Sequence, residues 1–199
     1  MTSERKNYDV VVVGAGNAAL TAALAAASEG AKVAILEKAP EHLRGGNSYF
    51  TGGLFRFAYN GIEDISELLP AITSDEKENI DVGSYKESEF YSDVMRVTEG
   101  LSDPSLLQTL TSKSFPTMLW MKDQGVPWIL AYGRQAFEHE GKQRFWGGLI
   151  VEAVGGGKGL SDRLFELVER NEIEVFYQTS GTKLSVNQSG SVDGITVKS

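Results

Sequence analysis

The pattern of apolar and polar residues changes along the first 38 residues, and its successive parts predict a strand, a helix and a second strand. Tyr8–Val13 is a β-branched apolar run typical of a buried parallel strand. The alanine-rich stretch that begins near Asn17 has the composition of a helix, and the next apolar run ends at Glu37. A strand, helix and strand in this order predict a βαβ unit, and therefore an α/β fold with a parallel sheet.

Helical spacing of apolar residues returns further along the chain. Lys86–Thr98 and Leu160–Arg170 both repeat apolar residues every three or four positions. Between them, Asp103 has the character of an N-cap, and Pro116–Gln124 is expected to be a second, separate helical run that ends before a glycine. The segment of residues 62–84 is polar and acidic, and it predicts short surface helices and loops.

The end of the chain is predicted to be β structure. The expected strands are Ile173–Gln178, Thr182–Val186 and Val192–Lys198, the last two joined by a turn at Asn187–Gly190. No later segment is expected to rejoin the N-terminal sheet. We therefore interpret residues 1–199 as the front part of a larger protein or as a truncated product.

Composition and charge exclude several classes of function. A formal net charge of −8 and a pI near 4.9 provide no basic stripe for general nucleic-acid binding. The absence of cysteine excludes disulfides, thiolate metal sites and cysteine nucleophiles in these residues. The first residues lack an apolar signal core, and no run approaches the roughly 20 apolar residues of a membrane span. The sequence therefore predicts a soluble, cytoplasmic protein.

The turn after the first strand carries the clearest chemistry. Gly14 permits a tight turn, Gly16 removes a side chain that would block a pyrophosphate, and Ala19 is small enough for close helix–sheet packing. The phosphates would bind the free N–H groups at the start of the helix. Glu37 follows Gly16 by 21 residues, where a carboxylate accepts hydrogen bonds from ribose. The pattern predicts a dinucleotide site and leaves both NAD and FAD open.

Two further glycine-rich segments differ in whether they are expected to bind a ligand; residues 44–53 are called the second glycine-rich segment below. The segment of residues 44–53, RGGNSYFTGG, combines backbone access with hydrogen-bonding side chains directly after the Glu37 strand. GGGKG at residues 155–159 is not a P-loop, because no Ser or Thr follows Lys158 and Glu152 stands where the first glycine is required. We interpret it as a helix-entry turn. The two histidines lack the spacing of a metal site.

The sequence resembles a known flavoprotein family. GAGNAALTAALAAASEGAKVAILEKAP and RGGNSYFTGG are similar to the family that includes the fumarate reductase and succinate dehydrogenase flavoprotein subunits. The stretches around SDPSLLQTL, LWMKDQGVPWIL and VEAVGGGKGLSDRLFELVER resemble its tricarballylate dehydrogenase subfamily most. The resemblance implies a Rossmann-like FAD-binding domain with an antiparallel hairpin near its C-terminal end, incomplete relative to the family.

The resemblance also implies roles for individual residues. FAD would be the dinucleotide, and Gly46 stands where succinate dehydrogenases carry the histidine that bonds to the flavin, so the FAD is expected to be non-covalent. The implied contacts with pyrophosphate, ribose, the path to the flavin and the adenine end are made by Gly14, Gly16, Ala18, Glu37, Asn47, Ser48, Thr51, Gly52, Gly53 and the backbone near Thr182.

Substrate and partners follow from the same resemblance. It implies hydride transfer between flavin N5 and a C–C bond of a small polycarboxylate such as tricarballylate, with electrons passed to a membrane-associated iron–sulfur partner. The family's capping domain, substrate-binding residues and final flavin-site segment have no counterpart in this sequence, so catalytic residues are not assigned. Two alternatives stay open: a non-catalytic flavin-binding or interaction module, and an NAD-dependent oxidoreductase. An uncovered apolar face is expected to favour self-association.

Overall fold

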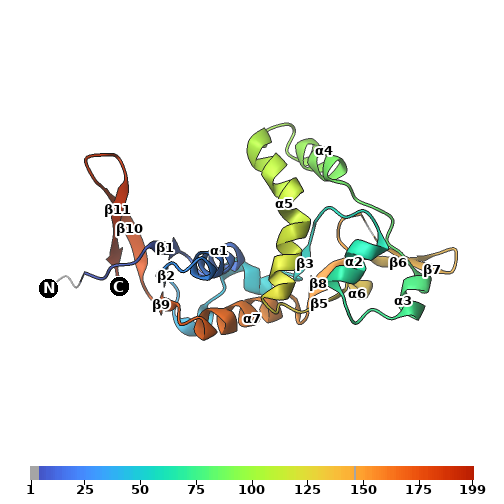
Figure 1. Cartoon of the computed structure of the whole chain (residues 1–199), viewed down its shortest axis with the longest axis horizontal. Helices are drawn as coiled ribbons and strands as arrows, with labels where there is room; N and C mark the ends of the chain where they lie inside the picture. The colour runs from blue at the N-terminus through green and yellow to red at the C-terminus, as the bar shows by residue number, and fades with distance from the viewer. Residues whose placement is uncertain (1–4, 146) are drawn as a thin grey trace. The chain divides into compact units, whose positions relative to one another are not determined.

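A computed structural model describes residues 5–145 and 147–199 and divides the chain into two compact units (Figure 1). The first unit consists of residues 1–51 and 157–199, and the second of residues 52–156. Each unit has its own sheets and its own buried core, so the two are described in turn. Within the described residues, no helix combines the length and apolarity that crossing a bilayer requires.

The first unit is built on a three-stranded parallel sheet. β1 (Val10–Val13), α1 (Asn17–Ser28) and β2 (Val33–Leu36) form the predicted βαβ unit, and β9 (Glu174–Phe176) pairs with the other side of β2. β2 is buried along its whole length, as expected for an apolar strand that has a neighbour on each side. The predicted α/β class with a parallel sheet is confirmed.

Two expectations about this sheet are wrong. β9 does rejoin the N-terminal sheet, although its three residues are too few for sequence alone to place. β1 is not fully buried, because Val11 and Val13 are 36% and 59% exposed. β1 is an edge strand in the described sheet, and alternate side chains of a strand point to opposite faces.

The remainder of the first unit consists of two 3₁₀ turns, a long helix and a hairpin. The turns span Glu41–Leu43 and Gly46–Phe50. α7 (Gly156–Arg170) buries the predicted apolar face, Leu160, Leu164, Leu167 and Val168. The predicted hairpin is confirmed: β10 (Ser180–Val186) pairs with β11 (Val192–Lys198), and Gly190 closes the turn with a φ of +85°.

The second unit contains two small three-stranded sheets. One has β8 (Val151–Ala153) between β3 (Leu54–Phe55) and β5 (Trp128–Leu130), all antiparallel. In the other, β7 (Lys142–Phe145) pairs with β6 (Ala136–His139) in a hairpin and with β4 (Ile80–Asp81) in parallel. Four of these short strands, β5, β6, β7 and β8, lie between residues 128 and 153.

Five helices complete the second unit: α2 (Ile62–Leu68), α3 (Ser74–Asn79), α4 (Glu87–Val97), α5 (Pro104–Asp123) and α6 (Tyr132–Gln135). Asp103 caps α5 as predicted, accepting hydrogen bonds from Ser105 N and Leu106 N. The expected second helical run at Pro116–Gln124 is wrong, because α5 continues through Pro116 without a break. Proline removes one helical hydrogen bond, but neighbouring packing holds the helix together.

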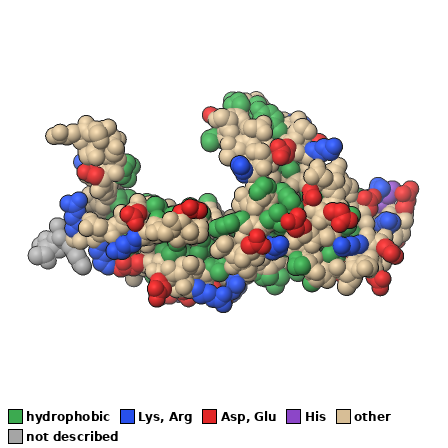
Figure 2. All heavy atoms as spheres, in the orientation of Figure 1, with side chains coloured by type: hydrophobic (Ala, Val, Ile, Leu, Met, Phe, Trp, Pro, Cys, Tyr) green, Lys and Arg blue, Asp and Glu red, His purple; other side chains and the backbone are tan. Residues whose placement is uncertain are grey.

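The adjoining ends of α4 and α5 expose aliphatic side chains, visible as hydrophobic surface in Figure 2. The exposed residues are Val97, Leu101, Leu106 and Leu110. The helical spacing of apolar residues in Lys86–Thr98 predicts that Val97 shares the inner face with Phe90, but Val97 is 71% exposed whereas Phe90 is 4% exposed. Val97 is the last residue of α4.

Candidate FAD-binding site

The glycine turn between β1 and α1 has the conformation that the sequence predicts. Gly14 has a φ of +102°, a region that residues with a Cβ rarely adopt. Its N–H donates to Leu36 O at 2.7 Å, which ties the turn to the end of β2. This bond places Glu37, the next residue, beside the turn, as a ribose-binding carboxylate requires.

A hollow of about 470 Å³ opens over this turn and the start of α1. Its lining residues are Val12, Val13, Gly14, Gly16, Asn17, Ala18, Ala19 and Ser48. The structure thus brings four predicted residues, Gly14, Gly16, Ala18 and Ser48, to one surface. Val12 and Val13, at the end of β1, line the hollow but were not predicted as contacts.

The second glycine-rich segment reaches this hollow through Ser48. Ser48 Oγ accepts a hydrogen bond of 3.0 Å from Asn17 N, one of the first N–H groups of α1. A Cβ built on Gly16 would lie 3.4 Å from the same hydroxyl oxygen. A helix start, a bare glycine and a hydroxyl therefore meet at one point.

A diphosphate fits this arrangement. The N-cap of α1 is Gly16, which provides no side-chain cap, so the N–H groups of the first turn face the hollow. Backbone N–H groups and the positive end of the helix dipole favour an anion here. Asn17 Oδ1 is buried without a hydrogen-bond partner in the described part of the chain.

Glu37 is held at the end of β2. Its residue is only 8% exposed, and its Oε1 accepts a hydrogen bond of 2.7 Å from Ala39 N. Its backbone also joins the sheet, since Glu37 N donates to Phe176 O and Glu37 O accepts from Thr179 N, each at 2.9 Å. A carboxylate has acceptor capacity beyond one bond, so this orientation is compatible with ribose recognition.

The other residues of the second glycine-rich segment lie outside the hollow. Asn47 is exposed within the 3₁₀ turn, and Thr51 Oγ1 donates to Ser48 O at 2.9 Å. Gly52 and Gly53 belong to the second unit. There, Gly53 has a φ of +73° and its carbonyl accepts from Ala153 N, while a Cβ on Gly52 would lie 2.6 Å from Arg134 Nη1.

The hairpin meets the end of β1. Thr182 is exposed, and its hydroxyl donates to Thr196 O across the hairpin. A Cβ built on its neighbour Gly181 would lie 3.6 Å from Val13 Cγ1, so the start of β10 is close to a residue that lines the hollow. The prediction for Thr182 concerned the backbone, and the position of this backbone is consistent with it.

Arg44 connects residues 44–53 to α7 and to Tyr177, the residue that follows β9. Its guanidinium carbon lies 4.1 Å from the centre of the Phe165 ring. Its Nη1 donates to Tyr177 Oη at 3.0 Å and to Glu169 Oε1 at 3.1 Å. Burial raises the pKa of the Tyr177 hydroxyl, so it stays protonated and accepts from the cation.

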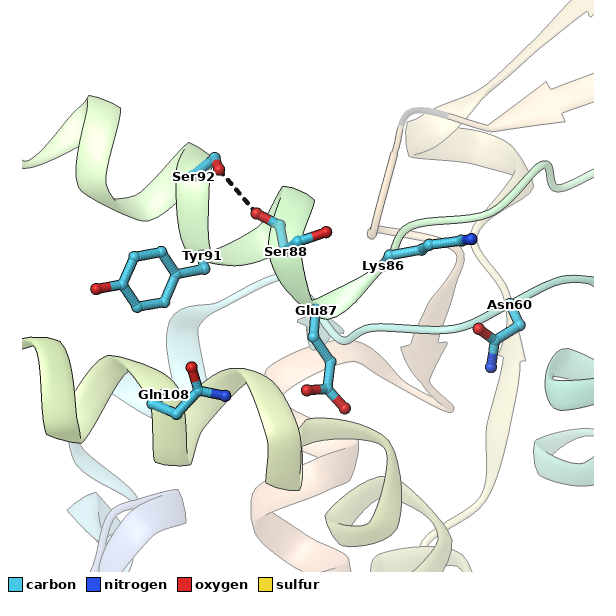
Figure 3. Close-up of a pocket in the computed structure, with 7 residues that line it drawn as sticks. All are labelled: Asn60, Lys86, Glu87, Ser88, Tyr91, Ser92 and Gln108. Carbon is cyan, nitrogen blue, oxygen red and sulfur yellow. Dashed lines mark hydrogen bonds between the residues drawn. The ribbon is translucent and has the colours of Figure 1, made fainter.

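A second hollow of about 620 Å³ lies in the other unit, beside α4 and α5 (Figure 3). It is lined by Asn60, Lys86, Glu87, Ser88, Tyr91, Ser92 and Gln108. None of these is a predicted site residue. Its lining is polar and includes both charge signs, which is typical of a solvated surface groove.

Comparison with known proteins identifies the family. The family described as FAD binding domain matches residues 9–199. Vinyl phenol reductase of Lactiplantibacillus plantarum is 28% identical over 99% of this chain and 35% of that protein. Fumarate reductase (cytochrome) of Shewanella frigidimarina is 27% identical over 96% of this chain and 29% of that protein. Urocanate reductase of Eggerthella lenta is 29% identical over 95% of this chain and 28% of that protein. The chain spans about a third of the length of these relatives.

Solved structures give the same result. The open conformation of a flavocytochrome c3 fumarate reductase is 25% identical, covers 96% of this chain and 30% of its own, and superposes with a TM-score of 0.69. A 3-ketosteroid-Δ4-(5α)-dehydrogenase from Rhodococcus jostii RHA1 shares the fold, with a TM-score of 0.68, 21% identity, and 96% and 42% coverage. The question between NAD and FAD is thereby answered. The chain belongs to the family of FAD-binding domains, has the fold of the fumarate reductase flavoproteins, and takes FAD as its cofactor.

Proposed function

We propose that this chain is the FAD-binding part of a dehydrogenase or reductase that acts on a C–C bond of a small polycarboxylate, such as tricarballylate. The observation that carries the proposal is the hydrogen bond from Asn17 N to Ser48 Oγ. It joins the two glycine-rich segments at the start of α1, where a diphosphate fits. Residues 1–199 would be the N-terminal part of the FAD-binding domain.

The residues of this chain would hold and orient the cofactor. The first N–H groups of α1 and the Ser48 hydroxyl would bind the pyrophosphate, and the Glu37 carboxylate would accept from the adenosine ribose. The small side chains at residues 14–19 would exclude water without blocking the phosphates. FAD, when bound, supplies the hydride chemistry. Because Gly46 has no side chain to bond to the ring, the attachment would be non-covalent.

The substrate class is supported by sequence motifs and by the names of relatives. Fumarate reductase, urocanate reductase and 4-oxocyclohexanecarboxylate 2-dehydrogenase are each named for a carboxylate. Vinyl phenol reductase is not, so the shared feature is a C–C bond that gains or loses two hydrogens. The motifs of residues 102–110 and 151–170 favour tricarballylate within this class.

The proposed electron partner and the proposed cellular location of the enzyme rest on the same family resemblance. A membrane-associated iron–sulfur protein would exchange electrons with the flavin of the complete enzyme. Two relatives carry other donors in their names, a cytochrome in one and NADH in another. The complete enzyme would work in the cytoplasm.

The visible spectrum of the purified chain tests the proposal, recorded before and after excess FAD and desalting. We expect flavin bands near ~370 and ~450 nm that denaturation releases intact, because the cofactor is held without a covalent bond. A colourless chain that also fails to retain added FAD would contradict the site. Dye-linked oxidation of tricarballylate should be absent in residues 1–199 alone. Robust turnover would show that this part already contains a substrate site.

A further inference from the structure

The GGGKG segment forms the first turn of α7. The helix begins at Gly156, so three of its first four residues are glycines. Glycine is the least favourable residue in a helix apart from proline, by about 1 kcal/mol relative to alanine. At Gly156 a φ of +66° favours glycine, whereas at Gly157 the neighbouring backbone leaves no room for a side chain.

The neighbour of Gly157 is the turn that carries Ser48. A Cβ built on Gly157 would lie 2.2 Å from Ser48 O, 2.7 Å from Thr51 O and 2.5 Å from Thr51 Oγ1. Real Cβ atoms do not approach other atoms so closely, so alanine at this position would displace the turn. Gly157 N donates to Thr51 O at 2.9 Å, which fixes the distance between the two backbones.

A second close contact, between Gly45 and Ser161, fixes the position of the N-terminal end of the same turn. A Cβ built on Gly45 would lie 2.4 Å from Ser161 Oγ, one helical turn further along α7. Ser161 is only 3% exposed and Gly45 has a φ of +100°, so neither residue has freedom to adjust. The turn of residues 46–50 is therefore held at both ends by the start of α7.

We propose that Gly157 is a positioning residue for FAD binding. Its missing side chain lets the start of α7 hold the Ser48 turn against α1, where Ser48 Oγ accepts from Asn17 N. The GGGKG segment, which fits no phosphate-binding motif, thus acts on the diphosphate through Ser48. Lys158 pairs with Asp162 on the same helix, and its ammonium group lies 5.8 Å from the centre of the Tyr49 ring in the Ser48 turn. The inference rests on the proposed FAD site.

The test compares the dissociation constants of FAD for Gly157→Ala and Gly133→Ala in the full 199-residue chain. Gly133 has open space around its Cα and an ordinary φ, so it is the matched control. We expect the dissociation constant to rise at least about tenfold in Gly157→Ala and to change less than about twofold in Gly133→Ala. Equal FAD affinity in the unsubstituted chain and in Gly157→Ala would overturn the inference.

A double-mutant cycle separates positioning from general destabilisation. If Gly157 acts through Ser48, Gly157→Ala should weaken FAD binding less in a Ser48→Ala background than in the unsubstituted chain. Additive effects would mean that Gly157 acts elsewhere. If Gly157→Ala does not fold, Thr51→Val tests whether the Ser48 turn must be held in place for FAD binding. This variant removes the hydroxyl that donates to Ser48 O, and Thr51 is exposed.

Thr51→Val should also weaken FAD binding if the Ser48 turn must be held in place. We expect its FAD dissociation constant to rise about threefold or more, and binding equal to that of the unsubstituted chain would overturn the inference. Failure of the unsubstituted chain to bind any FAD is a different result. It would contradict the flavin site itself, independently of Gly157.

Discussion

The hydroxyl of Ser48 and the backbone N–H of Asn17 lie 3.0 Å apart, joined by a hydrogen bond that spans 31 residues of sequence. One partner opens α1 and the other belongs to the second glycine-rich segment. The bond places a side-chain hydroxyl beside the N–H groups that would bind a diphosphate. The two glycine-rich segments, which the family resemblance predicts to share one FAD site, meet at this hydrogen bond.

Filling the hollow should abolish FAD binding without unfolding the chain. In Gly16→Val, the Cβ would lie 3.4 Å from Ser48 Oγ and its two methyl groups would occupy the space of the diphosphate. We expect the FAD dissociation constant to rise about 100-fold or more, which corresponds to about 2.7 kcal/mol. Fluorescence titration of FAD measures it, with far-UV circular dichroism to confirm folding.

Gly133→Val is the matched control for this change. It adds the same side chain at a position with open space in the second unit. Its FAD affinity should equal that of the unsubstituted chain. Undiminished binding by Gly16→Val would place the diphosphate somewhere other than the start of α1.

The sequence predicted the features that depend on neighbouring residues. The positive φ of Gly14 and the helix that follows are local, because a tight turn and a free helix start need only glycine and the residues after it. The turn at Asn187–Gly190 is local for the same reason. The family resemblance, not periodicity, supplied Ser48.

Features that depend on distant packing were missed. β9 contributes three residues to the sheet, and a pattern so short does not show which strand it will join. Pro116 suggested a break that the surrounding contacts of α5 override. The sequence predicted only a helix-entry turn at GGGKG, because the requirement for glycine at residue 157 arises from the backbone of Ser48, 109 residues earlier.

Tyr59 should make stability depend on pH in the alkaline range. Burial raises the pKa of its hydroxyl from 10.0 to about 12, and the hydroxyl donates to Val82 O at 2.7 Å. The raised pKa means that the unfolded chain loses the proton first. Its contribution is fully present below pH 10 and is lost as pH rises from 10 towards 12, by up to about 1.4 kcal/mol per pH unit.

Urea denaturation between pH 8 and 11.5 measures this loss. Tyr59→Phe should be less stable at pH 8 by about 1 kcal/mol, because Val82 O is left without its donor. Above pH 10 its free energy of unfolding should fall less steeply than that of the unsubstituted chain. Tyr91→Phe, on α4, should keep the steep dependence. Parallel curves for Tyr59→Phe and the unsubstituted chain would assign the alkaline loss to other groups.

The hairpin should cause self-association at high concentration. Leu184 pairs with Ile195 and Val186 pairs with Val192, so these side chains share a face of the β10–β11 ribbon. Leu184, Val186 and Val192 are 56%, 56% and 60% exposed. Exposed apolar ribbons of this kind associate to remove surface from water. Sedimentation should show a mass that rises with concentration above the 21.6 kDa of one chain.

Leu184→Thr with Val186→Thr should reduce this association, because threonine is well suited to strands but presents less apolar surface than leucine or valine. Leu106→Thr with Leu110→Thr is the control on α5, where both residues are also exposed. The control should associate as the unsubstituted chain does. A clean monomer of the unsubstituted chain at high concentration would count against self-association through any face.

Arg44 should stabilise the first unit through its guanidinium group and not only through its stem. The group lies over Phe165 and donates to both Tyr177 and Glu169, and the side chain is 26% exposed. Arg44→Met keeps an apolar stem of similar length but removes the planar donor. We expect a loss of about 2 kcal/mol in the free energy of unfolding, measured by urea denaturation near neutral pH.

Lys158→Met is the control for the loss of a cation in the same unit. Lys158 is 62% exposed and pairs with Asp162 along α7, and exposed pairs contribute little. Its unfolding midpoint should therefore remain where it is. Arg44→Lys distinguishes charge from shape, because an ammonium group cannot donate to two acceptors while lying flat over a ring. If Arg44→Lys is as stable as the unsubstituted chain, charge alone explains the contribution of Arg44.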